Sequence, residues 1–320
     1  MRLEKAIQGY LVSCSAGGYS PHTINDYRIN LERMSGHLGN PEMDSVTPQD
    51  LNRFFSWLRT GYQPKRMNGD ISPLKPVTIS KSWCAVRGFY NWATTEFDIP
   101  RPDNKLKAPK FDSPTITPFT EDEIKAILKF SEYSSLATTF SRTPFRMRTR
   151  NAFRDKALIL VLLDTGIRAS ECARLRTRDV NLETGEIFIV PHGTGQKTKS
   201  RHVYIGNTGR KALWKYLAKR EDMPVDDYLF LTDANRPMNR HSIRLVFRRI
   251  GKRAGISPCY PHLFRHTFAI QYLRNGGDVF TLQRLLGHST LDMVKRYLSI
   301  AKTDIQTAHR KASPVDRWRL

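Results

Sequence analysis

Two short stretches near the carboxyl end of the sequence contain side chains that could act together on an anionic substrate. "HLFRHTFA" begins at His262 and contains Arg265, and "LLGHSTLDMVKRY" contains His288 and Tyr297. His262 and Arg265 are three residues apart, so they would project together from one helix. His288 comes just before residues that can cap a helix, where backbone N–H groups attract anions. The two stretches therefore predict a cationic site with a phenol at its edge.

A third stretch, "TGIRASE", places Arg168 at the end of a strongly apolar helix. An arginine in such surroundings is costly unless it is paired or reaches an anion. Glu171, three residues further on, is an alternative partner for it. A basic stretch, "GTGQKTKSR", adds Lys197 and Lys199 between two alternating runs that predict a β-hairpin.

A phosphodiester under nucleophilic attack would use all of these groups. Guanidinium groups match the non-bridging oxygens, on which negative charge grows during the attack. A tyrosine phenol, with an ordinary pKa of about 10, is a poor nucleophile unless it is helped. We expect the cations to lower that pKa and to shield the phosphate, and a lysine to protonate the departing 5′ oxygen. This chemistry requires no metal.

Two arguments count against a metal or another cofactor. His262 and His266 have the i, i+4 spacing of a metal-binding pair, but the stretch lacks the glutamate of the HExxH proteases, and a neighbouring arginine opposes a cation. The cysteines form no CxxC pair, and we expect them to be reduced packing residues. They are Cys14, Cys84, Cys172 and Cys259.

The charge of the chain points to a polyanionic partner. Lys and Arg number 52 against 30 Asp and Glu, a formal net charge of +22. Double-stranded nucleic acid is the simplest partner for such a field, although a solubilising surface or a ribosome-associated protein would carry the same charge. The sequence shows no signal peptide, lipidation signal or apolar run of the ~18 residues that span a membrane. We therefore expect a cytoplasmic, nucleoid-associated protein with no membrane partner.

The 320 residues are enough for two domains. Residues 1–99 predict four helices, with start signals at Ser20 and Thr47, each followed by a proline. Lys81 and Arg87 lie off the apolar stripe of the last of these helices and are candidate contacts to a phosphate backbone. Residues 100–118 contain five prolines and four basic residues, which predicts a semi-rigid linker.

Residues 119–320 predict a second domain that is mainly helical. Thr120 and Glu123 form a capping box at its start, and residues 157–163 read as a buried helix. The hairpin runs "GEIFIV" and "RHVYI" provide a small antiparallel sheet. The Arg-rich stretch "SRTPFRMRTR" reads as a loop that either contacts DNA or is solvated.

Taken together, "TGIRASE", "HLFRHTFA" and "LLGHSTLDMVKRY" resemble the signature motifs of the tyrosine recombinases, the Xer and phage integrase superfamily. The resemblance implies that Arg168 and Arg265 clamp a phosphate. It further implies that His262 assists as a general base or clamp and that His288 orients the phosphate. Tyr297 would form a 3′-phosphotyrosyl bond. Lys197, nearer the hairpin tip, is preferred over Lys199 as the family lysine, and Lys199 then becomes a candidate DNA contact.

The same resemblance implies an N-terminal helical core-binding bundle of the SAM-like type and a C-terminal mixed α/β catalytic domain. It implies four subunits acting on two DNA sites, a C-terminal tail that docks on a neighbouring subunit, and ligation without ATP. Integration, excision or resolution of a mobile element or replicon would be the outcome, with an accessory DNA-bending or directionality factor as a further partner. No cofactor is implied.

Two other classes remain open from the sequence. A DNA-relaxing enzyme of the type IB topoisomerase kind, or a hairpin telomere resolvase, would use the same chemistry. A catalytically silent DNA-binding protein would use the charge alone, but the presence of all six catalytic residue types argues against it.

Overall fold

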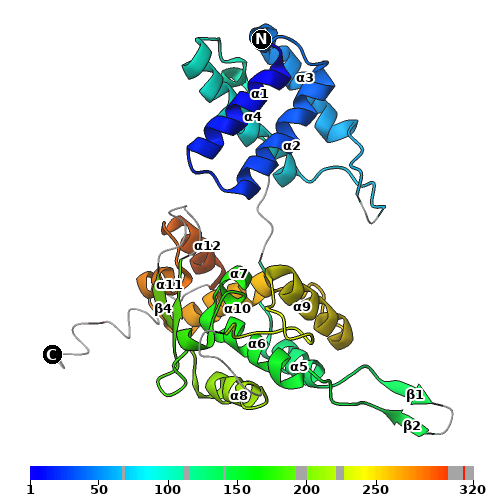
Figure 1. Cartoon of the computed structure of the whole chain (residues 1–320), viewed down its shortest axis with the longest axis vertical. Coiled ribbons are helices and arrows are strands. Elements are labelled where there is room, and N and C mark those ends of the chain that lie inside the picture. Colours follow the sequence, from blue (N-terminus) through cyan, green and yellow to red (C-terminus); the bar gives the residue numbers. More distant parts are fainter. Residues whose placement is uncertain are drawn as a thin grey trace. The chain divides into compact units, whose positions relative to one another are not determined.

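The structure is a computed structural model that describes residues 1–66, 69–110, 116–139, 142–191, 200–220, 227–301 and 313. The chain divides into two compact units, one built from the N-terminal residues Met1–Pro114 and the other from most of the remaining chain. Figure 1 shows both units, which are described separately below. The described part is mostly helical, as the sequence predicts, and its strands form two small antiparallel pairs, of which the sequence analysis predicted one.

Four helices make the N-terminal unit: α1 (Leu3–Ala16), α2 (Pro21–Leu38), α3 (Pro48–Thr60) and α4 (Pro76–Phe97). The predicted helix start signals, Ser20 and Thr47, are the N-cap residues of α2 and α3. The Ser20 hydroxyl accepts a hydrogen bond from the Thr23 N–H at 3.1 Å, and Thr47 shares a capping box with Asp50. The buried faces of the helices form one core, which includes Leu31, Phe54 and Phe89.

Both ends of the predicted linker pack against folded parts of the chain. A 3-10 turn, η2 (Pro102–Lys105), follows α4, and the Arg101 guanidinium contacts the buried Asp103 carboxylate at 2.6 Å. Leu106 completes the N-terminal core. At the other end, the Phe119 N–H donates to the Thr267 hydroxyl at 3.0 Å within the second unit.

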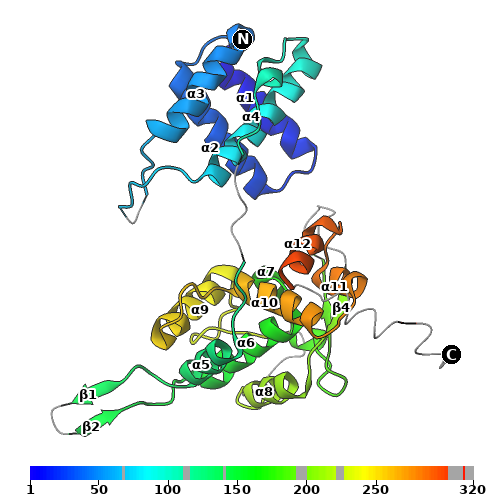
Figure 2. The same ribbon diagram turned by 180° about the vertical axis from the view of Figure 1, so that it is seen from behind.

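The second unit is built around α6 (Ala152–Thr165), whose residues Leu158, Val161 and Leu162 have no exposed surface. The other long helices are α5 (Glu121–Glu132), α8 (Asn207–Leu217), α9 (Arg240–Ala254), α10 (Pro261–Arg274), α11 (Val279–Leu286) and α12 (Asp292–Ala301). A single turn, α7 (Ala169–Cys172), and a 3-10 turn, η3 (Thr177–Asp179), follow α6. The views in Figure 1 and Figure 2 show α6 and α10 in the middle of this unit.

The predicted hairpin is present as β3 (Glu186–Ile189) and β4 (Arg201–Tyr204), paired antiparallel with Ile189 opposite Arg201. Ile187, Ile189 and Val203 point into the core, as strict alternation requires. The tip that joins the strands, residues 192–199, lies outside the described residues.

A second hairpin corrects the sequence analysis. Part of the stretch predicted as a loop, Arg142–Phe145, is strand β2, which pairs antiparallel with β1 (Ala137–Thr139). The hydrogen bond from the Ser134 N–H to the Met147 carbonyl, 2.7 Å, continues the pairing toward the body. In both views the hairpin extends away from the helices of its unit (Figure 1; Figure 2). The described side chains of Thr143 and Pro144 are exposed, and the stretch lacks the apolar periodicity by which strands are predicted.

Gly166, which ends α6, has a left-handed backbone (φ +62°), and a Cβ built on it would lie 2.3 Å from the Phe268 ring. Gly255 ends α9 with a similar φ of +70°, but a Cβ there would meet nothing within 4 Å. A substitution at Gly255 therefore tests backbone strain alone, whereas one at Gly166 tests backbone strain together with steric overlap.

We expect Gly255→Ala to cost about 1 kcal/mol of unfolding free energy, which is the left-handed strain alone. Gly166→Ala should cost about 3 kcal/mol, because overpacking against Phe268 adds to the same strain. Denaturant unfolding of both variants measures the difference. Equal losses would contradict the close packing of α6 on α10 at this point.

Candidate active site

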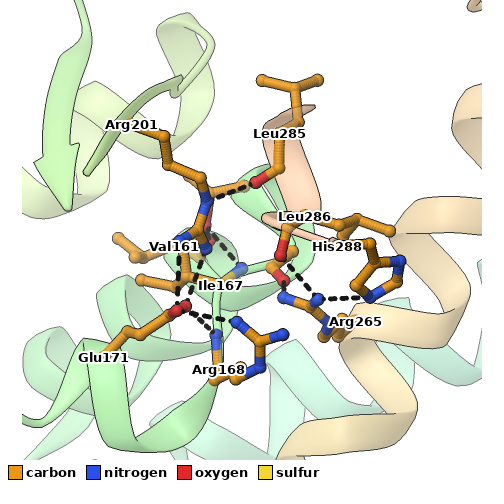
Figure 3. A network of polar contacts seen from close by, with 11 residues as sticks. Val161, Ile167, Arg168, Glu171, Arg201, Arg265, Leu285, Leu286 and His288 are labelled. Atoms are coloured by element: carbon orange, nitrogen blue, oxygen red, sulfur yellow. Dashed lines mark hydrogen bonds and ion pairs between the residues drawn. The ribbon is translucent and has the colours of Figure 1, made fainter. Parts of the chain in front are cut away.

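Arg265, on α10, is the centre of the candidate site, and its side chain is 1% exposed. Its Nη1 donates to the Gly166 carbonyl at 2.7 Å, and its Nη2 donates to the Leu286 carbonyl at 2.7 Å. Figure 3 shows the guanidinium group beside Leu286 and His288. Burial, followed by the charge of Arg168, lowers the pKa of Arg265 to about 10, so the group remains protonated at neutral pH.

The two carbonyls are available because both lie at helix C-termini. Gly166 ends α6, and Leu286 is the last residue of α11, which is followed by the left-handed Gly287 (φ +64°). The last carbonyls of a helix have no partner within it, and they carry the negative end of the helix dipole. Two helix ends therefore offset part of the cost of burying the Arg265 charge.

His288 is the third partner of Arg265, with its Nε2 2.8 Å from Arg265 Nη2. Because the guanidinium can only donate, Nε2 must accept, and this assigns the ring proton to Nδ1. Burial and the neighbouring Arg265 and Arg168 lower the pKa of His288 to about 4, which keeps the ring neutral. Within the described part of the chain, His288 Nδ1 and Arg265 Nε are buried without a hydrogen-bond partner. These are two donors for which an acceptor is missing.

Arg168 lies at the start of α7 and is tied to Glu171. Its backbone N–H donates to Glu171 Oε2 at 2.7 Å, and its Nη1 donates to Oε1 at 3.0 Å. The Arg168 side chain is 31% exposed, unlike that of Arg265. The sequence left open whether Arg168 pairs with Glu171 or reaches an anion. The two roles are compatible, because Arg168 pairs with Glu171 and its side chain still reaches the surface.

Glu171 also binds a second arginine, Arg201 of β4. Arg201 donates to both carboxylate oxygens, at 3.1 and 2.8 Å, and its Nε donates to the Leu285 carbonyl at 2.7 Å (Figure 3). Burial by itself raises the pKa of Glu171, but the hydrogen bonds and charges of Arg201 and Arg168 outweigh it and lower the pKa to about 2. One carboxylate thus joins β4, α7 and the end of α11.

Tyr297, on α12, is 4% exposed and packs with Ile270 and Leu286 in a small apolar cluster. Its ring lies nearly parallel to that of His288, with the centroids 6.4 Å apart. Its hydroxyl lies 2.8 Å from Nδ1 of His266. The nearest polar partner of the phenol is therefore the histidine beside Arg265 in the sequence.

The pKa of Tyr297 differs from the prediction. Burial raises it, and this effect outweighs the lowering by Arg265, Arg296 and Arg168. The sequence analysis counted the cations but not the apolar cluster that surrounds the ring. In this state the phenol keeps its proton at neutral pH.

His262 is the second residue of α10 and is exposed, with its ring edge-on to that of His266 at a centroid distance of 4.4 Å. Crowding by protein atoms lowers its pKa, and the charges of Arg265 and Arg168 add to this effect. His262 therefore contacts the partner of the phenol, and its ring remains accessible from outside.

The structure brings together Arg168, Arg265, His288 and Tyr297, with His262 at the rim. Sequence analysis missed the parts played by Arg201 and His266. His266 was considered only as a metal ligand, but the described residues contain no group of three or more His, Cys, Asp or Glu that could hold a metal ion. Lys197 and Lys199 lie outside the described residues. Lys81 and Arg87 are exposed on α4, in the N-terminal unit.

The depressed pKa of Glu171 makes stability depend on pH. The folded value of about 2 lies below the ordinary 4.5, so the stabilisation is present above pH 4.5 and is lost as the pH falls toward 2. For a shift of this size the loss is about 3 kcal/mol. Glu171→Gln should lose about 3 kcal/mol at pH 7, because Arg201 loses its charge partner, and should change less between pH 5 and pH 3.

Denaturant unfolding at pH 7, 5 and 3 measures this effect, with Glu183→Gln, an exposed glutamate of the same unit, as the control. If the stability of Glu171→Gln depended on pH as that of the wild type does, the arginines would not be lowering the pKa of the Glu171 carboxylate.

No helix in the described parts of the chain is long and apolar enough to cross a membrane.

Comparison with known proteins places this site in a family. The model of the phage integrase family matches residues 118–304, and the model of the phage integrase N-terminal SAM-like domain matches residues 7–96. Tyrosine recombinase XerC of Staphylococcus saprophyticus is 26% identical over 319 residues, which cover 98% of each chain. XerC of Oceanobacillus iheyensis is 28% identical over 306 residues, covering 92% of this chain and 91% of its own.

Among solved structures, the Tn1549 transposon integrase in complex with transposon right end DNA has a TM-score of 0.72 at 19% identity, over 91% of this chain and 94% of that chain. The lambda integrase dimer bound to a core site has a TM-score of 0.68 at 16% identity, over 92% and 97%. These likenesses show the shared fold. Because the first family model covers more than half of the chain, the protein belongs to the phage integrase family and is a site-specific recombinase of the tyrosine type.

Proposed function

We propose that this recombinase cuts one DNA strand with Tyr297, keeps the 3′ phosphate as a phosphotyrosyl ester, and rejoins it to the 5′ hydroxyl of a partner strand. The bond energy is retained in the ester, so ligation needs neither ATP nor a metal. The observation that carries the proposal is the pair of unpartnered buried donors, Arg265 Nε and His288 Nδ1, in a site that the Tyr297 ring also lines.

A scissile phosphate would supply the missing acceptor. Its non-bridging oxygens would take hydrogen bonds from Arg265, His288 and the part-exposed Arg168. The anion would also offset the mutual repulsion of Arg168 and Arg265, which contributes to the lowered pKa of Arg265. His262, at the accessible rim, would contact the same phosphate.

The departing 5′ oxygen needs a proton, and we assign its delivery to Lys197, with Lys199 as the alternative. Both belong to the hairpin whose strand β4 begins at Arg201, and Arg201 is bonded to Glu171. The hairpin base is therefore fixed to the same carboxylate that orients Arg168. In this proposal, Glu171 holds both Arg168, which binds the phosphate, and the base of the hairpin that carries the general acid.

We further propose that residues 1–99 bind DNA through Lys81 and Arg87, that residues 100–118 join them to a catalytic domain over 119–320, and that Lys199 contacts DNA. The solved XerH recombinase is bound to its palindromic difH substrate, and the Tn1549 integrase is bound to a circular intermediate DNA. By analogy, four subunits would assemble on two duplex sites, with the C-terminal tail docking on a neighbour. An accessory factor would set direction, in the nucleoid of a cell that carries a mobile element or replicon.

The direct test is to trap DNA on the protein. A pool of randomised duplexes with a nick near the centre is incubated with the full chain, and DNA that partitions with denatured protein is sequenced. We expect wild type to yield covalent adducts that share one sequence. Tyr297→Phe should bind the recovered duplex within about threefold of wild type but form no adduct, because only the phenol oxygen is lost. An adduct with Tyr297→Phe would show that a residue other than Tyr297 is the nucleophile.

Binding of the recovered duplex should weaken steeply with salt, because phosphate contacts release counterions. Between 50 and 200 mM salt we expect a loss on the order of a thousandfold. Lys81→Ala and Arg87→Ala should each reduce the slope of log affinity against log salt by about one. Lys125→Ala removes an equally exposed charge that pairs with Glu121 and serves as the control. A slope that the first two variants leave unchanged would exclude both residues as phosphate contacts.

A further inference from the structure

The phenol proton of Tyr297 has to leave when the oxygen attacks, and the structure shows which group lies beside it. His266 Nδ1 is 2.8 Å from the Tyr297 hydroxyl, across the contact between α10 and α12. His266 and Arg265 are neighbours on α10, so their side chains diverge by about 100° around the helix. Arg265 faces the ends of α6 and α11, while His266 faces α12. One helix therefore presents the phosphate clamp and the partner of the phenol side by side.

The protonation state of His266 suits a proton acceptor. Its pKa is lowered to about 4, first by burial and then by His262, Arg296 and Arg265. These charged or titratable neighbours come from α10 and α12, together with the phenol of Tyr297. At neutral pH the ring is therefore neutral and has one nitrogen that can accept. In the tautomer that carries its proton on Nε2, Nδ1 accepts the hydrogen bond from the phenol.

The other two histidines are less well placed for this role. His288 Nε2 already accepts from Arg265, and its Nδ1 carries the ring proton, so it has no free lone pair. His262 contacts the ring of His266 rather than the phenol. It remains at the rim, where the proposed function needs a contact to the phosphate.

Resting on the proposed function, we propose that His266 is the catalytic base that takes the proton of the Tyr297 phenol during cleavage. The Tyr297 O–H bond breaks and an Nδ1–H bond forms. At the same time the bond from the phenol oxygen to phosphorus forms, and the bond from phosphorus to O5′ breaks. O5′ takes a proton from the lysine. In religation the same imidazolium returns its proton to the departing phenol oxygen.

Bound DNA would improve this base. A phosphate anion between Arg168 and Arg265 adds negative charge near His266, which raises the pKa of the imidazole toward neutrality. General base catalysis is most efficient when the pKa of the base lies near the working pH. The free protein would thus hold a weak base, and the substrate itself would strengthen it.

The test compares His266→Asn with His266→Ala on the duplex recovered by trapping, with single-turnover adduct formation as the readout. Asn places an amide where Nδ1 lies and keeps a hydrogen bond to the phenol, but it cannot take a proton. We expect both variants to be slower than wild type by about a hundredfold or more, the usual range for loss of a general base. His266→Asn within about threefold of wild type would show that only positioning is needed and would overturn the proposal.

A second substrate separates the base from the acid. Replacing O5′ with sulfur at the cleaved bond gives a leaving group that needs no proton. The His266 variants should stay slow on this 5′-bridging phosphorothiolate, whereas Lys197→Ala or Lys199→Ala, whichever lysine is the acid, should regain the wild-type rate. Recovery of His266→Asn on the sulfur substrate would assign His266 to the leaving group and overturn the proposal.

The pH profile provides a readout that a structural role would not move. Wild-type cleavage should fall tenfold per pH unit below the pKa of His266 in the complex, because the protonated ring cannot accept. That limb should be absent in His266→Asn. Duplex binding and unfolding of the Asn variant, measured in parallel, control for folding. If wild type itself forms no adduct, the proposed function fails; if wild type reacts and the His266 variants keep pace, only this inference fails.

Discussion

The buried guanidinium of Arg265 is the interaction on which the rest of the second unit depends. An unpaired charge in a protein interior costs several kcal/mol, and here two helix C-termini and one neutral histidine surround it. For those contacts to form, α6 must end at Gly166, which is itself a left-handed glycine. In the same way α11 must end at Leu286, which is followed by the left-handed Gly287. The ends of two helices are therefore held by one side chain. The Arg265 side chain is therefore part of the core.

The same burial keeps the titratable groups beside Arg265 in their neutral forms. The Tyr297 phenol and the His266 and His288 rings all have pKa values displaced toward their neutral forms, and burial is the largest cause in each case. A protonated imidazole beside buried arginines costs more than a neutral one until an anion enters. In the proposed function, the charge of an entering phosphate would raise the pKa of the two imidazoles, while the arginines remain the groups that favour the phenolate form of Tyr297.

The sequence predicted helix starts well, because Ser20, Thr47 and Thr120 act through neighbours within three residues. It also predicted the family, because short motifs keep several chemical groups in order. It did not predict the contacts of Arg201 and His266, whose partners Glu171 and Tyr297 lie 30 and 31 residues away. Nothing in a one-dimensional pattern pairs an arginine on a strand with a carboxylate in a distant turn. The raised pKa of Tyr297 was missed for the same reason, since its apolar neighbours come from other helices.

Glu171 has a consequence for how this site can vary. A single carboxylate serves both Arg168 and Arg201, so a substitution at one arginine changes what the other one meets. Without Arg201, the freed oxygens would draw Arg168 inward, away from the surface. The effects of the three positions are therefore coupled rather than additive. Evolutionary change here should be epistatic, because the effect of substituting one of the three residues depends on which residues occupy the other two positions.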